Sequence, residues 1–387
     1  MNPYFFNKKA LVVGAGAMGG GIAQVLVEAG WDVLLYDTQD AALENGISRV
    51  RSTWDKLVEK GKISDAQRSA FNNQLKATYV LREAVDVCLA IEAIYENLDA
   101  KRSVFTTLDD VVREDCILAT NTSSLSVAAI ASGVKRADRV VGLHFFNPAP
   151  LMPLVEIVPG LATDPVLVSA CVDAVAAWGK VGVVAQDTPG FLVNRIARPY
   201  YGEALHLVEE RMADMATVDW ALTELGGFRM GPFALMDLIG HDVNYVVTET
   251  VWKQFYYDPR FRPSLSQKRL LEAGWLGRKS GRGFYNYRSG ASLPEPTRDE
   301  ALGRRIVDRV VAMLINEAAD AVYRGIGSES DVETAMLKGV NYPKGLIAWG
   351  REWGWTAVRD QIEALHRRTG DSRYRVCPWI HDQISAQ

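Results

Sequence analysis

The chain has 387 residues, which is enough for two or three domains of ordinary size. Its composition, 48% hydrophobic and 23% charged, is typical of a globular protein. A net charge of −4 gives no reason to expect binding to nucleic acid or to a membrane surface, so an anionic ligand would be met by local cations or helix N-termini.

The first third of the chain alternates short β-rich runs with helical patterns. The expected strands are ALVV (10–13), DVLLYD (32–37), VCLAIEAI (87–94), CILATN (116–121) and VVGLHFF (140–146). This alternation predicts an α/β domain with a mostly parallel, doubly wound sheet and helices on both faces. The uncharged stretch from Ala10 to Val27 is interrupted by glycines, so it is interpreted as strand, turn and helix and not as a membrane span.

A glycine-rich turn follows the first strand. Gly14, Gly16 and Gly19 have G-x-G-x-x-G spacing, and Asp37 ends the next strand. The glycines predict a Rossmann-type pyrophosphate site at a helix N-terminus, and the Asp37 carboxylate predicts NAD over NADP because it would repel a 2′-phosphate. The alternatives are a tight strand–helix turn without a ligand, and a turn or cap role for Asp37.

An insertion follows Asp37. The run LENGISRVRSTWDKLVEKGKISDAQRSAFNNQL (43–75) is long, charged and helical in period, and GKIS (61–64) interrupts it with a turn. These features predict a helical hairpin inserted between two strands and standing partly off the sheet.

Residues 141–158, VGLHFFNPAPLMPLVEIV, place His144 and Glu156 in otherwise apolar surroundings, where an unpaired charge is costly. Three prolines favour a reversal that sets LVEIV beside VVGLHFF as a further strand. A histidine oriented by a carboxylate is the proton acceptor that oxidation of an alcohol needs. The alternatives are a core or edge histidine and a solvated Glu156 on an edge strand. Upstream, NTSSL (121–125) either reaches a substrate from the end of a strand or caps a helix.

Beyond Asp187 the sequence shows few β-strand patterns and mostly helical ones. Asp187 and Pro189 predict the N-cap and first turn of a helix through DTPGFLVNRIARPYYGEALHLVEE. The stretch RSGASLPEPTRDE is interpreted as a linker because of its Ser, Pro and Gly content. The expected domains are a dinucleotide-binding domain (1–186), a first helical domain (187–287), a linker (288–300) and a second helical domain (301–387).

The two helical regions are related by an internal repeat. NRIARPYYGEALHLV (194–208) aligns without gaps on DRVVAMLINEAADAV (308–322), and the same offset pairs Gly231 with Gly345 and Gly240 with Gly354. This match predicts a duplicated all-α domain. The second copy lacks GRKSGRGFYNY and has Asp308 in place of Asn194, so it is interpreted as architectural.

The cysteines and the N-terminus bear on the compartment. Cys88, Cys116, Cys171 and Cys377 form no CxxC pair and have no neighbouring His at metal-ligand spacing, so neither a disulfide framework nor a metal site is expected. The first residues, MNPYFFNKKA, lack the charged-then-apolar order of a signal peptide. A reducing, cytoplasmic location is therefore expected.

Taken together, these motifs resemble the L-3-hydroxyacyl-CoA dehydrogenase family over nearly the whole chain. The resemblance is carried by GAGAMGGGIAQ, EAIYEN, NTSSLSV, GLHFFNP, DTPGFLVNR, MGPFALMDLIG and GRKSGRGFYNY. It implies reversible, NAD-dependent oxidation of an (S)-3-hydroxyacyl-CoA to the 3-oxoacyl-CoA, with the small thioester as partner. The duplicated helical domain resembles that of the larger and fused members.

The resemblance also implies roles for single residues. His144 looks like the catalytic base and Glu156 its orienting partner, and Ser123 and Asn194 resemble residues that contact the reacting substrate. The implied cofactor contacts are Gly14, Gly16, Met18, Gly19, Asp37, Glu96, Lys101, Ser123 and Lys279, and the implied coenzyme A and substrate contacts are Thr53, Lys60, Ser123 and Asn194. His241 stands where the family pattern has an apolar residue and is expected to face solvent or the domain interface.

Two other functions remain open from the residues alone. One is an NAD-dependent dehydrogenase of a free hydroxy acid, as in the crystallin-like gulonate dehydrogenases of this fold. The other is a non-catalytic protein that binds a dinucleotide. Because single-copy family members pair through the helical domain, the second copy is expected to fill that groove from within the chain, which would give a monomer or a homodimer through another face.

Overall fold

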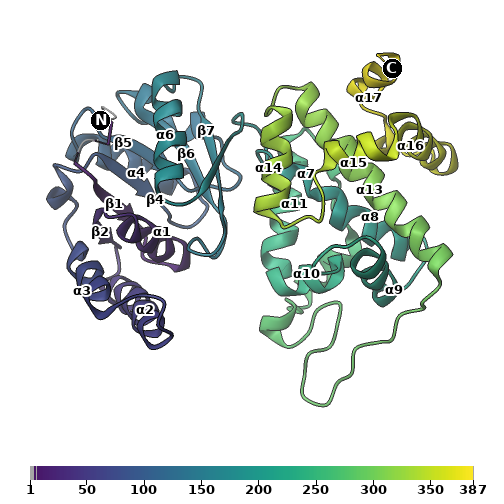
Figure 1. Cartoon of the computed structure of the whole chain (residues 1–387), viewed down its shortest axis with the longest axis horizontal. Coiled ribbons are helices and arrows are strands. Elements are labelled where there is room, and N and C mark those ends of the chain that lie inside the picture. Colours follow the sequence, from purple (N-terminus) through teal and green to yellow (C-terminus); the bar gives the residue numbers. More distant parts are fainter. Residues whose placement is uncertain (1–3, 6, 387) are drawn as a thin grey trace. The chain divides into compact units, whose positions relative to one another are not determined.

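The computed structural model describes residues 4–5 and 7–386, and the chain divides into two compact units between Thr188 and Pro189 (Figure 1). Each unit has its own core. Within the described ranges, no helix combines the length and the apolar character that crossing a bilayer requires.

The first unit contains an eight-stranded sheet in the order β3-β2-β1-β4-β5-β6-β7-β8, parallel except for the antiparallel pair β6–β7. The strands are β1 (Lys9–Val13), β2 (Asp32–Tyr36), β3 (Leu75–Thr78), β4 (Leu89–Glu92), β5 (Ile117–Thr120), β6 (Val140–Phe145), β7 (Leu154–Pro159) and β8 (Val181–Val184). The six strands expected from the sequence are confirmed. The prediction missed β3 and β8, the two edge strands, because four-residue runs are too short to show a period.

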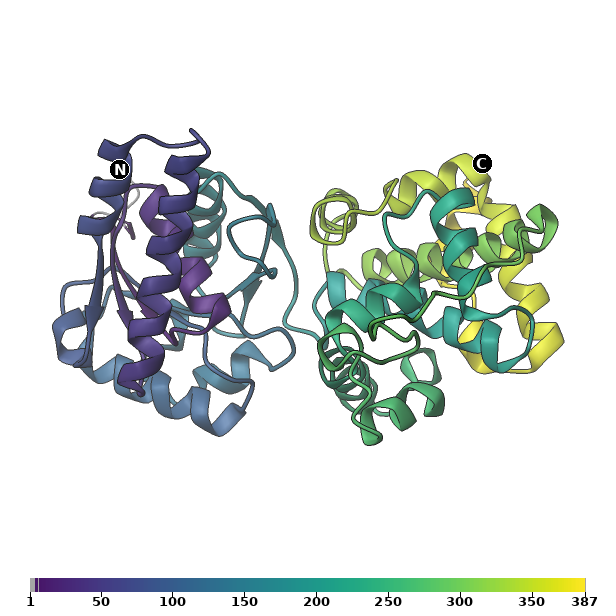
Figure 2. The ribbon, with the colours of Figure 1, turned by 90° about the horizontal axis from the view of Figure 1, so that it is seen from below.

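The helices of the first unit are α1 (Ala17–Glu28), α2 (Asp40–Glu59), α3 (Asp65–Gln74), α4 (Leu98–Val111), α5 (Val127–Ala131) and α6 (Pro165–Ala177). The predicted helical hairpin is confirmed as α2 and α3, which lie side by side next to α1 (Figures 1 and 2). Ser64 and Gln67 form a capping box at the start of α3. Buried Leu43, Ile47, Val50 and Trp54 attach α2 at helical spacing, whereas α3, described in full, buries none of its residues.

The predicted cap at Asp187 is wrong in its target. The Asp187 carboxylate accepts hydrogen bonds from the Ser126 hydroxyl (2.8 Å) and from the amides of Val127 (3.0 Å) and Ala128 (2.8 Å), so it caps α5. The next helix, α7, begins only at Val193. An aspartate before a helical pattern predicts a local cap, but the unpaired amides of α5 bind this carboxylate instead.

The second unit is all helical. Its helices are α7 (Val193–Ile196), α8 (Arg198–Glu209), α9 (Met215–Trp220), α10 (Pro232–Ile239), α11 (His241–Gln254), α12 (Leu265–Glu272), α13 (Glu300–Tyr323), α14 (Glu329–Gly339), α15 (Leu346–Trp353), α16 (Trp355–Thr369) and α17 (Pro378–Ser385). Residues 291–299, in the segment interpreted as a linker, hold neither helix nor strand.

The predicted repeat recurs in the structure at the same offset. Helix α10 and helix α15 have the same length, and each is followed by a glycine with positive φ, Gly240 (96°) and Gly354 (91°). Asp219 caps α10 by accepting from the amides of residues 233 and 234 (both 2.9 Å), and Glu333 caps α15 by accepting from the equivalent amides of residues 347 and 348 (2.7 and 3.3 Å). The two copies therefore share a tertiary capping device as well as a helix order.

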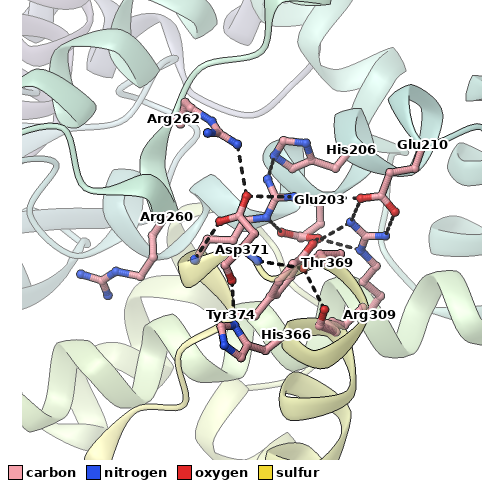
Figure 3. A network of polar contacts seen from close by, with 12 residues as sticks. Glu203, His206, Glu210, Arg260, Arg262, Arg309, His366, Thr369, Asp371 and Tyr374 are labelled. Atoms are coloured by element: carbon pink, nitrogen blue, oxygen red, sulfur yellow. Dashed lines mark hydrogen bonds and ion pairs between the residues drawn. The ribbon is translucent and has the colours of Figure 1, made fainter.

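The two copies contact each other through reciprocal, buried ion pairs. Arg195 donates from Nε to Glu317 Oε1 at 2.8 Å, and its repeat counterpart Arg309 donates from Nε to Glu203 Oε2 at 2.7 Å. Figure 3 shows Arg309 bound to Glu203 and Glu210, beside Tyr374. Such reciprocity is the mark of a two-fold interface, here formed between two copies inside one unit.

Candidate active site

A hollow of about 640 Å³ opens at the carboxyl ends of the strands in the first unit. It lies between β1 and β4, where the strand order changes from one side of the sheet to the other. Ligands bind at this switch point in folds of this kind. The lining residues are Val13, Gly14, Gly16, Tyr36, Asp37, Thr38, Leu81, Ala93, Ile94, Tyr95, Ala100, Ser103, Val104 and Thr107.

The glycine turn shapes one wall of this hollow. Gly14 has φ of 104°, and a Cβ there would lie 2.5 Å from the Ala93 carbonyl oxygen, so no larger residue fits. A Cβ at Gly16 would meet no atom within 4 Å, and Gly16 lines the hollow, so its backbone is open to a ligand. Helix α1 begins at the next residue without a side-chain cap, and its N-terminal amides suit the pyrophosphate of NAD. Met18 is half-buried in the first turn of α1.

Asp37 follows β2 and lines the same hollow. Its carboxylate accepts from the Ala15 amide (2.8 Å) and from the Gln39 amide (3.0 Å), which leaves acceptor positions for ribose hydroxyls. Arg49 of α2 donates to the Ala15 carbonyl at 2.8 Å, so both the amide and the carbonyl of this residue in the glycine turn are bound by side chains. Sequence reasoning missed Arg49, because nothing local separates it from the other cations of the hairpin.

His144 and Glu156 stand directly opposite each other in the β6–β7 ladder. The His144 Nδ1 atom lies 2.6 Å from Glu156 Oε2, and the residues are 6% and 0% exposed. The predicted contact is therefore confirmed. Asn121 of the NTSSL motif accepts from the Phe145 amide at 2.8 Å, which ties that motif to the residue after His144.

A second polar cluster gathers Glu96, Lys101 and Ser123 near the end of β5. Glu96 Oε1 accepts from the Thr122 hydroxyl (2.5 Å) and from the Ser123 amide (3.0 Å), and Glu96 Oε2 lies 3.2 Å from the Lys101 ammonium. Desolvation raises the pKa of Glu96, but the Lys101 charge and the hydrogen bonds outweigh it and lower that pKa. Lys101 is 1% exposed and also binds buried Glu92 at 2.7 Å, a partner that the sequence reading missed.

The other predicted contacts lie on separate elements. Thr53 is half-buried on α2 and Lys60 is exposed at its C-terminus; seven residues apart, they share one helix face at a separation of about 10 Å. Asn194 and Lys279 belong to the second unit. The Asn194 carbonyl accepts from Arg198 Nε at 2.8 Å, and Lys279 pairs with Asp242 at 2.5 Å. The ligand contacts of all four residues stay predictions.

His241 was expected to face solvent or the domain interface, and the solvent alternative is wrong. The side chain is 0% exposed, and its Nε2 atom lies 2.9 Å from Asp237 Oδ1. Asp237 also accepts from the amides of Phe284 and Tyr285, both at 2.9 Å. Asp237 lies on α10 and His241 begins α11, so the turn at Gly240 between the two helices gives His241 a buried partner that an apolar residue would not need.

The family model described as the NAD binding domain of 3-hydroxyacyl-CoA dehydrogenase matches residues 9–188. The family model described as the C-terminal domain of 3-hydroxyacyl-CoA dehydrogenase matches two stretches, residues 190–287 and 306–387. The double match agrees with the internal repeat.

Three relatives illustrate the similarity. The 3-hydroxyadipyl-CoA dehydrogenase of Escherichia coli K12 is 36% identical over 96% of each chain. The probable 3-hydroxybutyryl-CoA dehydrogenase of Bacillus subtilis 168 is 39% identical over 72% of this chain and 97% of its own. The crystal structure of 3-hydroxybutyryl-CoA dehydrogenase from Escherichia coli K12 matches with a TM-score of 0.93 and 34% identity, covering 97% of this chain and 98% of that one.

Proposed function

This chain belongs to the 3-hydroxyacyl-CoA dehydrogenase family, and on that premise we propose how its own residues carry out the NAD-dependent oxidation of a 3-hydroxyacyl-CoA to the 3-oxoacyl-CoA. The observation that carries the proposal is the contact between His144 and Glu156. Bound NAD supplies the hydride acceptor for this reaction.

We assign the transfer of the substrate hydroxyl proton to His144. With Glu156 at Nδ1, the favoured neutral tautomer carries its proton on that nitrogen, which assigns exchange with the substrate hydroxyl to Nε2. In oxidation, neutral His144 takes the hydroxyl proton as the hydride leaves the substrate carbon. In reduction, the imidazolium returns that proton to the substrate oxygen. The Glu156 carboxylate, which is fully buried, stabilises the imidazolium in both directions.

Hydrogen-bond donors accompany the proton transfer. We assign Ser123, Asn194 and protonated His144 to the 3-oxygen, where negative charge develops when a 3-oxo group receives a hydride. The glycine turn, Met18 and Asp37 would hold NAD at the hollow of the first unit. The remaining assigned contacts are Glu96, Lys101 and Lys279 for the cofactor and Thr53 and Lys60 for coenzyme A.

A direct assay tests the activity. The chain is expected to oxidise NADH when acetoacetyl-CoA is supplied and to leave free acetoacetate unreacted, because the thioester carries the coenzyme A contacts. The alternative of a dehydrogenase for free hydroxy acids is not favoured by the relatives, which are named for CoA thioesters. Turnover of the free acid alone would contradict the proposal. A panel of 3-hydroxyacyl-CoA thioesters, compared by kcat/KM, then ranks the acyl groups.

Asp37 sets the cofactor preference. Asp37→Asn removes the charge that repels a 2′-phosphate, so we expect the kcat/KM ratio for NADPH over NADH to rise about 10-fold, equivalent to ~1.4 kcal/mol. The matched control is Asp32→Asn at the exposed start of the same strand, which should leave the ratio unchanged. An equal ratio in both variants would remove the assigned role of Asp37.

The proposal also covers the cellular location and the oligomeric state of the chain. We propose a cytoplasmic enzyme, because its four cysteines are buried free thiols, as is usual in reducing compartments. The reciprocal pairs of Arg195 with Glu317 and of Arg309 with Glu203 support an internal substitute for a dimer interface. We therefore expect a monomer, or a homodimer through another face, by light scattering. A tight dimer that is lost only when residues 301–387 are removed would count against the internal substitute.

A further inference from the structure

Lys180 is buried beside the loop that connects the strands of His144 and Glu156. It directly precedes β8, and it is only 9% exposed. Its ammonium group donates to three backbone carbonyls of loop 146–153, those of Ala149 (2.7 Å), Pro150 (3.1 Å) and Met152 (2.8 Å). An ammonium group carries three donors, so this one loop engages all of them.

The composition of loop 146–153 explains why it takes an outside donor. Three of its eight residues, 148, 150 and 153, are prolines and carry no backbone N–H. Its own amides supply two bonds, from Leu151 and Met152 to the Pro148 carbonyl, both at 3.0 Å. Buried carbonyls without donors are costly, and the Lys180 ammonium supplies them.

The loop is also held from both sides. The Lys180 amide donates to the Val175 carbonyl at 3.1 Å, and the Val181 amide donates to the Pro153 carbonyl at 2.8 Å. These two bonds fix the backbone of Lys180 beside the start of β7. On its other side the loop packs against α1, since a Cβ at Gly21 would lie 3.1 Å from Pro150 Cδ. The loop therefore lies between the Lys180 ammonium and the helix that follows the glycine turn.

The position of this loop matters because it joins β6 to β7. In an antiparallel ladder a one-residue slip turns every side chain to the other face, so the pairing of these strands decides whether Glu156 faces His144. Burial lowers the pKa of Lys180, and Glu28 on α1 opposes that shift. An ammonium that bonds carbonyls in an apolar setting is costly to bury, whereas a methionine would fill the space at less cost.

We propose that Lys180 is a positioning residue for the reaction: by clamping loop 146–153 it keeps Glu156 opposite His144. This inference rests on the roles proposed above for those two residues. Because a displacement of about 1 Å in a catalytic group costs on the order of 10²-fold in rate, loss of the clamp should be visible in kcat.

The test is a double-mutant cycle on the full chain. Lys180→Met is expected to lower kcat for acetoacetyl-CoA reduction by about 10- to 10²-fold, with KM for NADH within about 2-fold of wild type. In a Glu156→Gln background the same change should lower kcat little further, because the group that Lys180 positions is already gone. The matched control, Lys135→Met, removes an exposed lysine that pairs with Asp110 and should leave kcat unchanged.

Two results would overturn the clamp while the role of Glu156 stands. One is a kcat for Lys180→Met within about 2-fold of wild type. The other is the same fold-loss in the wild-type and Glu156→Gln backgrounds, which would show a structural effect independent of Glu156. A wild-type kcat in Glu156→Gln would instead remove the proposed role of Glu156, and the clamp with it. A lowered kcat in Glu156→Gln together with a wild-type kcat in Lys180→Met would remove the clamp alone and leave the role of Glu156 intact.

A second variant covers a failure of Lys180→Met to fold, which circular dichroism would report. Lys180→Arg keeps the charge, but its planar guanidinium cannot direct three donors from one nitrogen to three carbonyls. We expect an intermediate fall in kcat, about 3- to 10-fold, that again shrinks in the Glu156→Gln background. Wild-type kcat in a folded Lys180→Arg would exclude a clamp that depends on three donors from one nitrogen.

Discussion

Replacing His144 with glutamine is expected to lower kcat for acetoacetyl-CoA reduction by about 10²- to 10⁴-fold, the usual contribution of a general acid–base. Glutamine has a similar volume and can still hydrogen-bond, but it cannot exchange a proton at neutral pH. His144 lies in β6 and not in the hollow assigned to NAD, so NADH should bind with nearly the wild-type Kd. Stopped-flow turnover and NADH fluorescence titration measure the two effects separately.

The matched control is His381→Gln on the exposed face of α17, which should leave both kcat and NADH binding unchanged. Turnover by His144→Gln within a few-fold of wild type would contradict the assignment of the base. Loss of NADH binding together with turnover would show that the residue supports the fold of the first unit instead.

Replacing Arg309 with methionine is expected to destabilise the second unit by about 3–5 kcal/mol, the usual cost of breaking a buried ion pair. Arg309 is 2% exposed and binds Glu203 at 2.7 Å and Glu210 through two bonds of 2.8 Å (Figure 3). Without the guanidinium, the Glu203 carboxylate, which is 3% exposed, keeps the Tyr374 hydroxyl at 2.9 Å and the more distant Arg373 at 3.8 Å. For a unit of about 200 residues, this cost lowers Tm by roughly 6–20 °C.

Differential scanning calorimetry measures the change, and Arg304→Met is the control. Arg304 lies on the same helix, α13, but it is exposed and pairs with Glu300 one turn away, so its loss should move Tm little. Adding Glu203→Gln to Arg309→Met should recover part of the lost stability, because the second change removes the unpaired charge. Equal Tm values for the two single variants would show that the reciprocal pair contributes nothing measurable.

Much of the site could be predicted from local sequence. The glycine turn, the strand that ends at Asp37, and the reversal between His144 and Glu156 each depend on residues close together in the chain. Turns and short strands are fixed by backbone conformations that neighbouring residues allow, so the spacing carries the information. The contact at 2.6 Å was therefore foreseeable once the prolines were interpreted as a reversal.

Long-range polar partners were the part that sequence reasoning missed or misassigned. Asp187 stands before a helical pattern, yet it caps a helix that begins 60 residues earlier. Arg49 on the helical hairpin donates to the glycine turn, and Asp237 is the buried partner of His241. A polar side chain binds whichever buried group lacks a partner, and that group is known only after the elements have packed.

The sequence by itself determined the alternation of strands and helices, the dinucleotide turn, the hairpin insertion and the duplication, because periodicity and turn residues act over a few positions. The tertiary structure decided which distant groups meet. Lys180 reaches a carbonyl 31 residues earlier, and Arg309 reaches a carboxylate 106 residues earlier. Burial makes each of these unpaired groups costly, so folding brings together charges and donors that no local pattern connects.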